Sequence, residues 1–418
     1  GGMILADRTL LLINKFYHDI GPSGGVGRYI MQEEEDLTAR GWNIVPFAMK
    51  DADARPSPWD TFFVRAHDYS SPRFDPKAAL SLIWNREAAR NLDRLLNQVK
   101  PDVAHVHNIY HHLSPSILPV LAKHGVPVVM TLHDLRLLCP AIHMLRNGEV
   151  CERCKGGRLE QAVAGRCVKG SRSASLLAAV ETWNQRSRGL YEGAVTRFLC
   201  PSAFYARKYE EWGYPGTKLE HMPNFVDLDG WRPIARDPDD IVLFFGRLSR
   251  EKGLSTLLRA YAAWRERRES SGSPPPPALM IAGSGPAEAE LQQEAAALGL
   301  HDVFLGGLAP VDLKELLPRA RFTVLPSEWY ENGPLSLLES LAAGVPVVGA
   351  DIAGIPECLD DGVEGVLFPP GDVEALTDAL DRADALGPDA RRAARVRAQL
   401  HHDRNTHMDR LEDILSCI

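Results

Sequence analysis

The segment PSEWYENGPLSLLESLAAGVPVVGADIAGIPE, residues 326–357, predicts a loop, a helix and a buried strand in direct succession. Pro334 suits the first position of the helix, because its ring fixes a helical φ and its missing N–H has no partner there. Three leucines at three-residue spacing give the helix one apolar face: Leu335, Leu338 and Leu341. Gly344 is typical of the residue after a helix end, and the apolar run 345–348 is typical of a buried parallel strand. The segment therefore predicts an α/β fold.

Two carboxylates stand eight residues apart in this segment, Glu331 in the loop and Glu339 inside the helix. Free N–H groups at a helix start favour phosphate or other electron-rich oxygens. An ionised carboxylate only accepts hydrogen bonds, so each can hold a pair of adjacent sugar hydroxyls. The pattern fits a ligand with two diols, and it fits equally well a surface glutamate beside an ordinary capped helix.

A second loop, GRLSREKG at residues 246–253, follows a continuous apolar strand predicted at 241–245. Arg247 and Lys252 lie five residues apart in this loop, just before a helix predicted at 254–268. A guanidinium binds two oxygens at once and an ammonium adds a point charge, so the pair predicts a diphosphate clamp. The alternative is a surface loop whose charges only aid solubility.

The loop at 21–28 lies between a strand predicted at 9–14 and a helix predicted at 29–40, and three of its four glycines are candidate ligand contacts: Gly24, Gly25 and Gly27. Glycine lets the backbone approach a ligand closely, and a plain turn is the alternative. Farther along, a strand predicted at 128–133 ends in His133.

These segments resemble family 4 of the retaining glycosyltransferases, through Glu-x7-Glu, Gly-x-Pro-Val-Val and Gly-x-Pro-Glu at 331–357 and Gly-Arg-Leu-x-x-Glu-Lys-Gly at 246–253. The resemblance spans nearly the whole chain and implies the GT-B fold, with two Rossmann-like α/β domains facing across a cleft. It implies transfer of a hexose from a UDP- or GDP-sugar to a sugar or lipid-linked acceptor in polysaccharide or glycoconjugate synthesis. No metal and no covalent nucleophile are then required.

The resemblance also assigns roles. It implies four catalytic residues: His133, Arg247, Lys252 and Glu331. It implies that the donor is bound by Gly24, Gly25, Gly27, Gly246, Arg247, Lys252, Asn332, Gly333, Pro334, Leu335 and Glu339. Glu331 is expected to meet the transferred sugar, and Glu339 the ribose diol about 12 Å farther along the helix. The family commonly has Glu-Gly-Phe-Gly where this chain has 331–334, a difference that bears on the accepted sugar.

Two other functions fit the same motifs. A sugar-nucleotide epimerase of this fold would use the same clamp. A zinc-containing binding protein with a degenerate transferase body would bind a partner and no nucleotide.

Four cysteines have the spacing C-x11-C-x2-C-x12-C: Cys139, Cys151, Cys154 and Cys167. The Cys-x2-Cys knuckle with two flanking thiols resembles a four-thiolate structural zinc site. Four reduced thiols that merely pack together and a redox pair are the alternatives. Four histidines also fall within eight residues: His105, His107, His111 and His112. No carboxylate or thiolate is adjacent at ligand spacing, so a polar strand end lining a cleft is favoured over a metal site.

Composition limits the partners and the compartment. The net charge of −8 and the pI near 6.0 do not indicate nucleic-acid binding. Seven cysteines without an export signal predict the reducing cytoplasm. Residues 153–197 nevertheless contain nine basic and three acidic residues, a net charge of about +6. This segment predicts either contact with an anionic membrane at its inner face or with an anionic acceptor, or only a solvated surface.

The predicted organisation has three parts. An N-terminal acceptor-side domain covers residues 1–226 and carries a cysteine-rich basic insertion at 139–172. A nucleotide-sugar-binding domain covers 227–395, and a final helix within 396–418 crosses back to the first domain. Single helices are predicted at 77–98 and at about 390–416.

Overall fold

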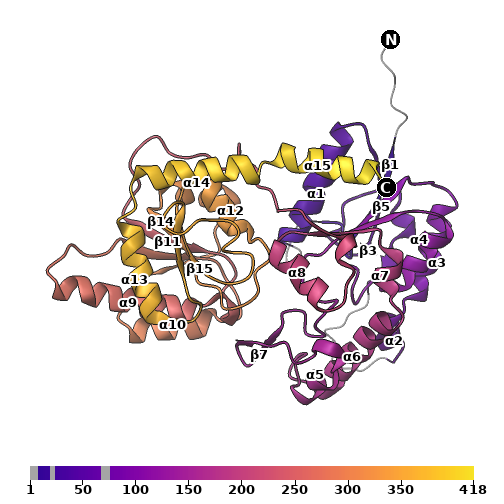
Figure 1. Ribbon diagram of the computed structural model, residues 1–418, viewed down its shortest axis with the longest axis horizontal. Helices are drawn as coiled ribbons and strands as arrows, with labels where there is room; N and C mark the ends of the chain where they lie inside the picture. Colours follow the sequence, from indigo (N-terminus) through magenta and orange to yellow (C-terminus); the bar gives the residue numbers. More distant parts are fainter. Residues whose placement is uncertain (1–7, 19–23, 67–75) are drawn as a thin grey trace, which may run out of the picture.

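The computed structural model describes residues 8–18, 24–66 and 76–418, and it contains two α/β domains that lie side by side (Figure 1). Each domain is built on a six-stranded sheet in which all neighbouring strands are parallel. Parallel strands need helical crossovers that cover both faces of the sheet, which explains the continuous apolar runs of the sequence. The predicted GT-B architecture is confirmed.

The N-terminal sheet has the order β10-β9-β6-β5-β1-β2. Its strands are β1 (Thr9–Ile13), β2 (Asn43–Phe47), β5 (Val103–Val106), β6 (Val128–Thr131), β9 (Arg197–Cys200) and β10 (Leu219–His221). The helices of this half are α1 (Gly24–Ala39), α2 (Pro76–Ile83), α3 (Arg86–Leu96), α4 (Leu118–Lys123), α5 (Glu160–Ala164), α6 (Arg172–Ser187), α7 (Leu190–Ala194) and α8 (Ala203–Glu211). Two small sheets pair β3 (Met49–Lys50) with β4 (Val64–Arg65), and β7 (Leu145–Arg146) with β8 (Glu149–Val150).

The C-terminal sheet has the order β13-β12-β11-β14-β15-β16, which is the strand order of dinucleotide-binding folds. Its strands are β11 (Ile241–Phe245), β12 (Ala278–Ala282), β13 (Phe304–Gly306), β14 (Phe322–Leu325), β15 (Val347–Ala350) and β16 (Gly365–Phe368). Its helices are α9 (Leu254–Ser270), α10 (Glu288–Ala297), α11 (Pro310–Leu316), α12 (Leu335–Ala342), α13 (Val373–Asp384) and α14 (Pro388–His401).

The chain ends with two helices, so the prediction of one helix at about 390–416 is wrong. Helix α14 stops at His401, and α15 (Arg404–Ser416) begins after Asp403, whose carboxylate accepts the N–H of Thr406. A capping aspartate favours a new helix start over continuation of the old one. Helix α15 then packs on the N-terminal domain beside α1 (Figure 1), where its inward-facing side chains join the core: Met408, Leu411 and Leu415.

Three other local predictions also need correction. The helix predicted at 77–98 is two helices, because Asn85 caps α3 by accepting the N–H of Ala88. Helix α1 begins at Gly24 and not at residue 29, and part of the predicted loop lies outside the described residues. Pro334 has an extended ψ of 129° and immediately precedes α12, so it is one position outside the helix.

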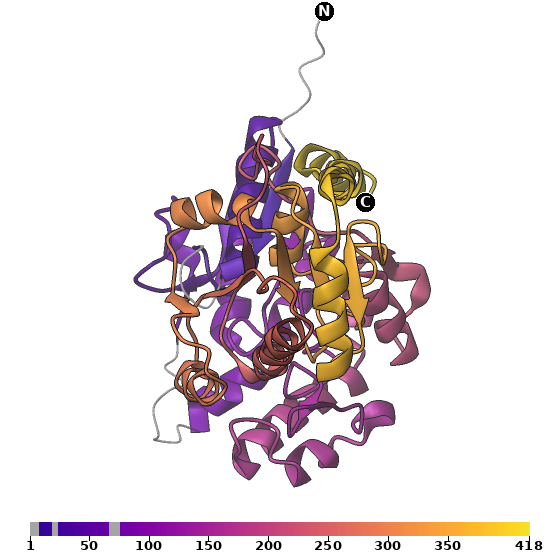
Figure 2. The ribbon, with the colours of Figure 1, turned by 90° about the vertical axis from the view of Figure 1, so that its left-hand side faces the viewer.

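The cysteine-rich segment projects from the main body of the N-terminal domain. The hairpin of β7 and β8 and the helices α5 and α6 lie at the lower side of the molecule in two perpendicular views (Figures 1 and 2). The predicted domain boundaries, including those of the insertion at 139–172, remain a prediction.

Candidate active site

The two most specific sequence motifs lie side by side at one edge of the C-terminal sheet. Loop 246–253 follows β11 and loop 326–334 follows β14, and these two strands are neighbours. The strand order reverses between them, because β12 and β13 lie on one side and β15 and β16 on the other. Open α/β sheets bind ligands at this point, beyond the carboxyl ends of the strands.

The close contact between the two loops depends on Gly253. Its φ is +69°, and a Cβ at this position would overlap the carbonyl oxygen of Pro326. The neighbouring backbones are also joined, since the N–H of Glu328 donates to the carbonyl of Glu251 at 2.8 Å. Only glycine satisfies both the backbone angle and the space.

Lys252 and Glu331 form an ion pair across these loops, with 2.6 Å between Nζ and Oε1. The hydroxyl of Ser327 donates to the same oxygen at 2.7 Å, and the Trp329 ring centre lies 5.2 Å from the ammonium. Burial alone would raise the pKa of Glu331, but the Lys252 charge and the hydrogen bonds lower it below the ordinary value. Glu331 is therefore ionised at neutral pH and holds Lys252 in place.

Arg247 lies on the exposed surface of the same loop. Within the described part of the chain its side chain has no hydrogen bond or ion pair. Its guanidinium is therefore available to an anion that enters beside Lys252.

Glu339 meets a cation from the other domain. Its Oε1 lies 3.0 Å from Nη1 of Arg28, which is in α1. Burial raises the pKa of Glu339 to about 7, although the charges of Arg28 and Lys314 act in the opposite direction. The carboxyl group of Glu339 therefore titrates near neutral pH, unlike that of Glu331.

The three predicted glycines of the N-terminal domain stand in the first turn of α1. A Cβ on Gly25 would lie 3.4 Å from Cδ1 of Leu335, the first residue of α12. The N-terminal ends of α1 and α12 therefore face each other across the domain interface, and their free N–H groups favour anions.

Asn332 is placed at the site, but its side chain is used by the domain interface. Its Oδ1 accepts from the hydroxyl of Ser202 at 3.0 Å, and its Nδ2 donates to the carbonyl of Leu132 at 2.9 Å. Asn224 donates to the carbonyl of Gly333 at 3.0 Å. Only the backbone N–H of Asn332 is left for a ligand. The role of its amide between the domains could not be predicted, because its partners lie 130 and 200 residues away in the chain.

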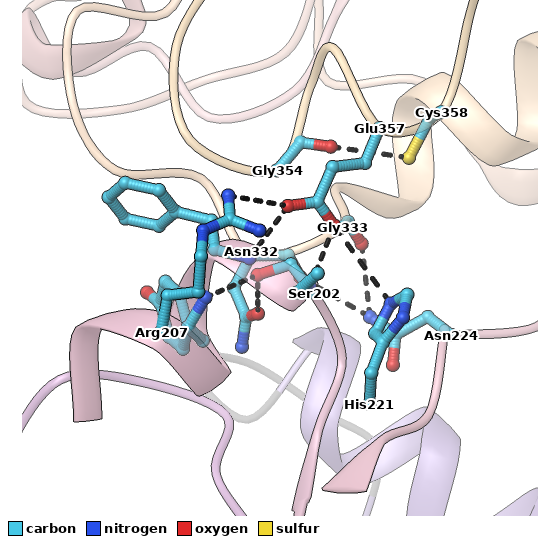
Figure 3. Close-up of polar contacts among 12 residues, drawn as sticks. Ser202, Arg207, His221, Asn224, Asn332, Gly333, Gly354, Glu357 and Cys358 are labelled. Carbon is cyan, nitrogen blue, oxygen red and sulfur yellow. Dashed lines mark hydrogen bonds and ion pairs between the residues drawn. The ribbon is translucent and has the colours of Figure 1, made fainter. Parts of the chain in front are cut away.

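Glu357, the last residue of the Gly-x-Pro-Glu motif, binds the start of α8 in the other domain (Figure 3). Its two carboxylate oxygens accept the N–H groups of Ala203 and Phe204 at 2.7 and 2.6 Å. Arg207 and His221 lie within 4 Å of the same carboxylate. The sequence contained the motif, but its role could not be predicted because Ala203, at the start of α8, lies 154 residues earlier in the chain.

His133 ends a buried chain of polar groups. Its Nε2 lies 2.9 Å from Nδ1 of His107. The Nε2 of His107 lies 3.3 Å from Oε2 of Glu33, whose other oxygen is 2.5 Å from Nδ1 of His105. Burial lowers the pKa of His107 to about 4 and that of His133 well below its ordinary value, so both rings are neutral at pH 7.

This cluster corrects the prediction of a cleft-lining strand end, because His105 and His107 are fully buried. Sequence reasoning also missed Glu33, since the carboxylate comes from the middle of α1 and not from the strand. Among the described residues, Glu33, His105 and His107 are the group whose ligand atoms all lie within 4.8 Å of one another. The four cysteines lie elsewhere, around a small cavity in the projecting segment.

Two family models together match most of the chain. The model "Glycosyltransferase Family 4" matches residues 23–229, and "Glycosyl transferases group 1" matches residues 231–399. The chain belongs to the family 4 glycosyltransferases. The resemblance seen in the motifs is thereby confirmed.

Relatives of this family 4 member include glycogen synthase of Mycobacterium tuberculosis, which is 31% identical over 315 residues, 73% of this chain and 65% of that protein. The chain spans between 18 and 65% of the length of the first curated relatives that it matches. Within the described ranges, no helix is both long and apolar enough to cross a bilayer.

Two solved structures share the fold over nearly the full length. Sucrose-phosphate synthase from Thermosynechococcus elongatus has a TM-score of 0.70 at 20% identity, over 97% of this chain and 98% of its own. Anabaena HepE in complex with UDP and glucose has a TM-score of 0.66 at 18% identity, over 98% of this chain and 100% of its own.

The raised pKa of Glu339 predicts a pH-dependent stability. The folded state keeps the proton up to about pH 7, whereas the unfolded state loses it near pH 4.5. The stabilisation is therefore complete below pH 4.5 and is lost as the pH rises to 7. Urea denaturation at pH 5 and at pH 8 measures the free energy of unfolding. From pH 5 to pH 8, the wild type should lose about 1–3 kcal/mol more of this free energy than Glu339→Gln does. The same difference for the exposed control Glu374→Gln, or none for Glu339→Gln, would contradict this assignment.

Proposed function

We propose that this protein is a retaining glycosyltransferase that moves a hexose from a UDP- or GDP-sugar to a sugar or lipid-linked acceptor. One observation carries the proposal: Lys252, held by the ionised Glu331, and the exposed Arg247 share one loop at the point where the strand order of the C-terminal sheet reverses. The family supports the transfer reaction, and the UDP and glucose bound to HepE support the class of donor.

The donor spans the cleft in this proposal. Arg247 and Lys252 bind the diphosphate, together with the N–H groups at the start of α12. Glu331 accepts hydrogen bonds from the hexose hydroxyls, and Glu339, one to two turns along α12, accepts from the ribose diol. The glycines of α1 and Gly246 let backbone come close to the phosphates and the sugar.

The transfer proceeds on one face of the sugar. The bond from the anomeric carbon to the diphosphate oxygen breaks, and its electron pair stays on the diphosphate. Arg247 and Lys252 stabilise the charge that develops there. The departing phosphate oxygen takes the proton of the acceptor hydroxyl as the acceptor oxygen bonds to the anomeric carbon from the same side, which retains the configuration.

His133 contributes position and shape on the N-terminal side of the cleft. Its ring is neutral and is hydrogen-bonded to His107, whose Nε2 lies 3.3 Å from Oε2 of Glu33. A neutral imidazole can hydrogen-bond the sugar without adding a charge at the anomeric carbon. No metal takes part in this reaction, and the four cysteines enter the proposal only as a structural zinc site.

The two alternative functions have less support. Relatives and neighbours are named as synthases and transferases, which does not favour an epimerase. A degenerate transferase body does not explain why the cations and carboxylates of both motifs converge on one cleft.

The clamp is tested by Arg247→Ala and Lys252→Ala. Each variant should lose at least about tenfold in transfer rate, because a charge-assisted contact to the leaving group is lost. Arg250→Ala is the matched control, since Arg250 lies between the two in sequence but points to Glu290 on the surface. Assays with a panel of UDP- and GDP-sugars measure the rates, and donor alone as substrate tests for epimerisation. Wild-type rates in either clamp variant would remove the clamp from the mechanism.

The division of roles between the two carboxylates is tested by nucleotide binding. At pH 8, Glu339→Gln should weaken UDP or GDP by about 1–3 kcal/mol, the value of a lost charged hydrogen bond. Glu331→Gln should cut turnover and leave this affinity nearly unchanged, because the Lys252 that it releases still faces the diphosphate. Calorimetry with both nucleotides decides the matter, and the opposite pattern would exchange the two roles.

We further propose a cytoplasmic protein that touches an anionic membrane through the projecting segment. Helix α6 exposes three apolar side chains, Leu176, Val180 and Trp183, with 54, 40 and 62% of their surface accessible. They border an open groove of about 690 Å³ that also contains Arg172. Apolar anchors beside basic residues suit a membrane interface. Part of the predicted charge is used within the protein, since Lys155 pairs with Glu211.

Vesicle sedimentation tests this contact. Wild type should bind vesicles that contain anionic lipid more strongly than zwitterionic vesicles, and Leu176→Ser with Trp183→Ser should reduce the bound fraction severalfold. The control pair Val396→Ser and Leu400→Ser removes exposed apolar side chains from α14 and should change nothing. Equal binding to both vesicle types, or recovery of the protein outside the cytoplasm after cell fractionation, would overturn the proposal.

A further inference from the structure

Four cysteines line one small cavity in the projecting segment: Cys139, Cys151, Cys154 and Cys167. They come from separate parts of the segment: Cys151 follows β8, Cys167 follows α5, Cys154 lies in a turn, and Cys139 lies in the loop before β7. The cavity has a volume of about 10 Å³, which is enough for one ion or water and too small for an organic ligand.

Two arginines lie beside these sulfur atoms. Arg153 lines the cavity, and Nε of Arg146 and Sγ of Cys167 lie 3.0 and 2.9 Å from the same point, the position of a Cβ on Gly165. Cysteine binds a metal as the thiolate, and nearby positive charge favours that form. This setting suits four thiolates around a divalent cation, because that complex has a total charge of −2.

The alternatives explain less. All four thiols are free. A redox-active Cys-x2-Cys pair accounts for Cys151 and Cys154 but not for the presence of Cys139 and Cys167 at the same cavity. Simple packing of neutral thiols does not account for the two arginines beside the sulfur atoms. A tetrahedral zinc site has sulfur atoms about 3.8 Å apart, as follows from Zn–S bonds of about 2.3 Å. The described residues contain no three cysteine sulfur atoms within 4.8 Å of one another, so the side chains must turn inward on binding.

The same segment contacts loop 326–334 of the other domain, called the donor loop below, at two points. Glu152, between Cys151 and Cys154, accepts from the hydroxyl of Tyr330 at 2.8 Å. His143, between Cys139 and Cys151, has its ring centre 5.0 Å from that of Trp329. Trp329 and Tyr330 immediately precede Glu331.

We propose that the four cysteines bind one structural zinc ion and that this site positions the donor loop through Glu152. Lys208 binds the Glu152 carboxylate at 2.8 Å, and zinc would in addition fix both ends of the Cys-x2-Cys turn that carries Glu152. Glu152 then stays opposite Tyr330, and Glu331 keeps its place beside Lys252. This second part rests on the proposed donor site, whereas the metal site does not.

Metal analysis of the reduced, full-length protein tests the site. Wild type should carry about one zinc per chain, and the double variant Cys151→Ser, Cys154→Ser should carry close to none. Cys417→Ser is the control, because it removes an exposed thiol outside the cluster and should keep the metal. Folded wild type that takes up no zinc on titration, or a double variant that keeps it, would overturn the metal site.

The link to the donor loop is tested without disturbing the ligands. Glu152→Ala and Tyr330→Phe should keep the zinc and raise the donor KM about threefold to tenfold, and combining them should add little. Glu149→Ala, on the same hairpin and exposed, should leave KM unchanged. An unchanged KM in Glu152→Ala would overturn the link. If no nucleotide sugar is used at all, the proposed function and the link fail together, and the zinc content still decides the metal site.

Discussion

The closed arrangement of the two domains depends on one carboxylate at one helix end. Glu357 accepts two N–H groups at the start of α8, where the helix dipole adds to the attraction. These are short, charge-assisted bonds, and they bring loop 326–334 against the N-terminal domain. The interdomain bonds of Asn332 and Asn224 follow from that placement (Figure 3). The cleft therefore has its shape before any ligand enters.

Within the cleft, cations and carboxylates are matched in pairs that a ligand must share. Lys252 is held by Glu331, and Arg28 by Glu339, so the positive charge of the site is partly neutralised. A diphosphate would add negative charge beside Lys252 and Arg247, while sugar hydroxyls would donate to the carboxylates. The cations of these pairs would thus meet another anion, and the carboxylates would accept hydrogen bonds from another donor. The charges of the ligand-free site are therefore arranged much as they would be with the donor bound, which limits the reorganisation that catalysis requires.

The sequence predicted those features whose cause is local. The α/β class, both motif loops and the pairing of glycine with tight loop contact follow from residues within a few positions of one another. The helix breaks at Asn85 and Asp403 were missed because apolar periodicity outweighed a single capping residue. Glu33, Asn332 and Glu357 could not be assigned, since each acts on residues more than 70 positions away in the chain. The burial of His105 and His107 was missed for the same reason: their carboxylate lies on another element.

The return of α15 to the N-terminal domain makes the chain cross between the domains twice. The two crossings are neighbours, because the N–H of Val226 donates to the carbonyl of His402 at 2.9 Å and Val226 pairs with Asp403. Two adjacent tethers oppose sliding and separation of the domains more than they oppose bending. They therefore favour rotation about an axis near residues 226 and 402 as the way in which the two domains would move relative to each other.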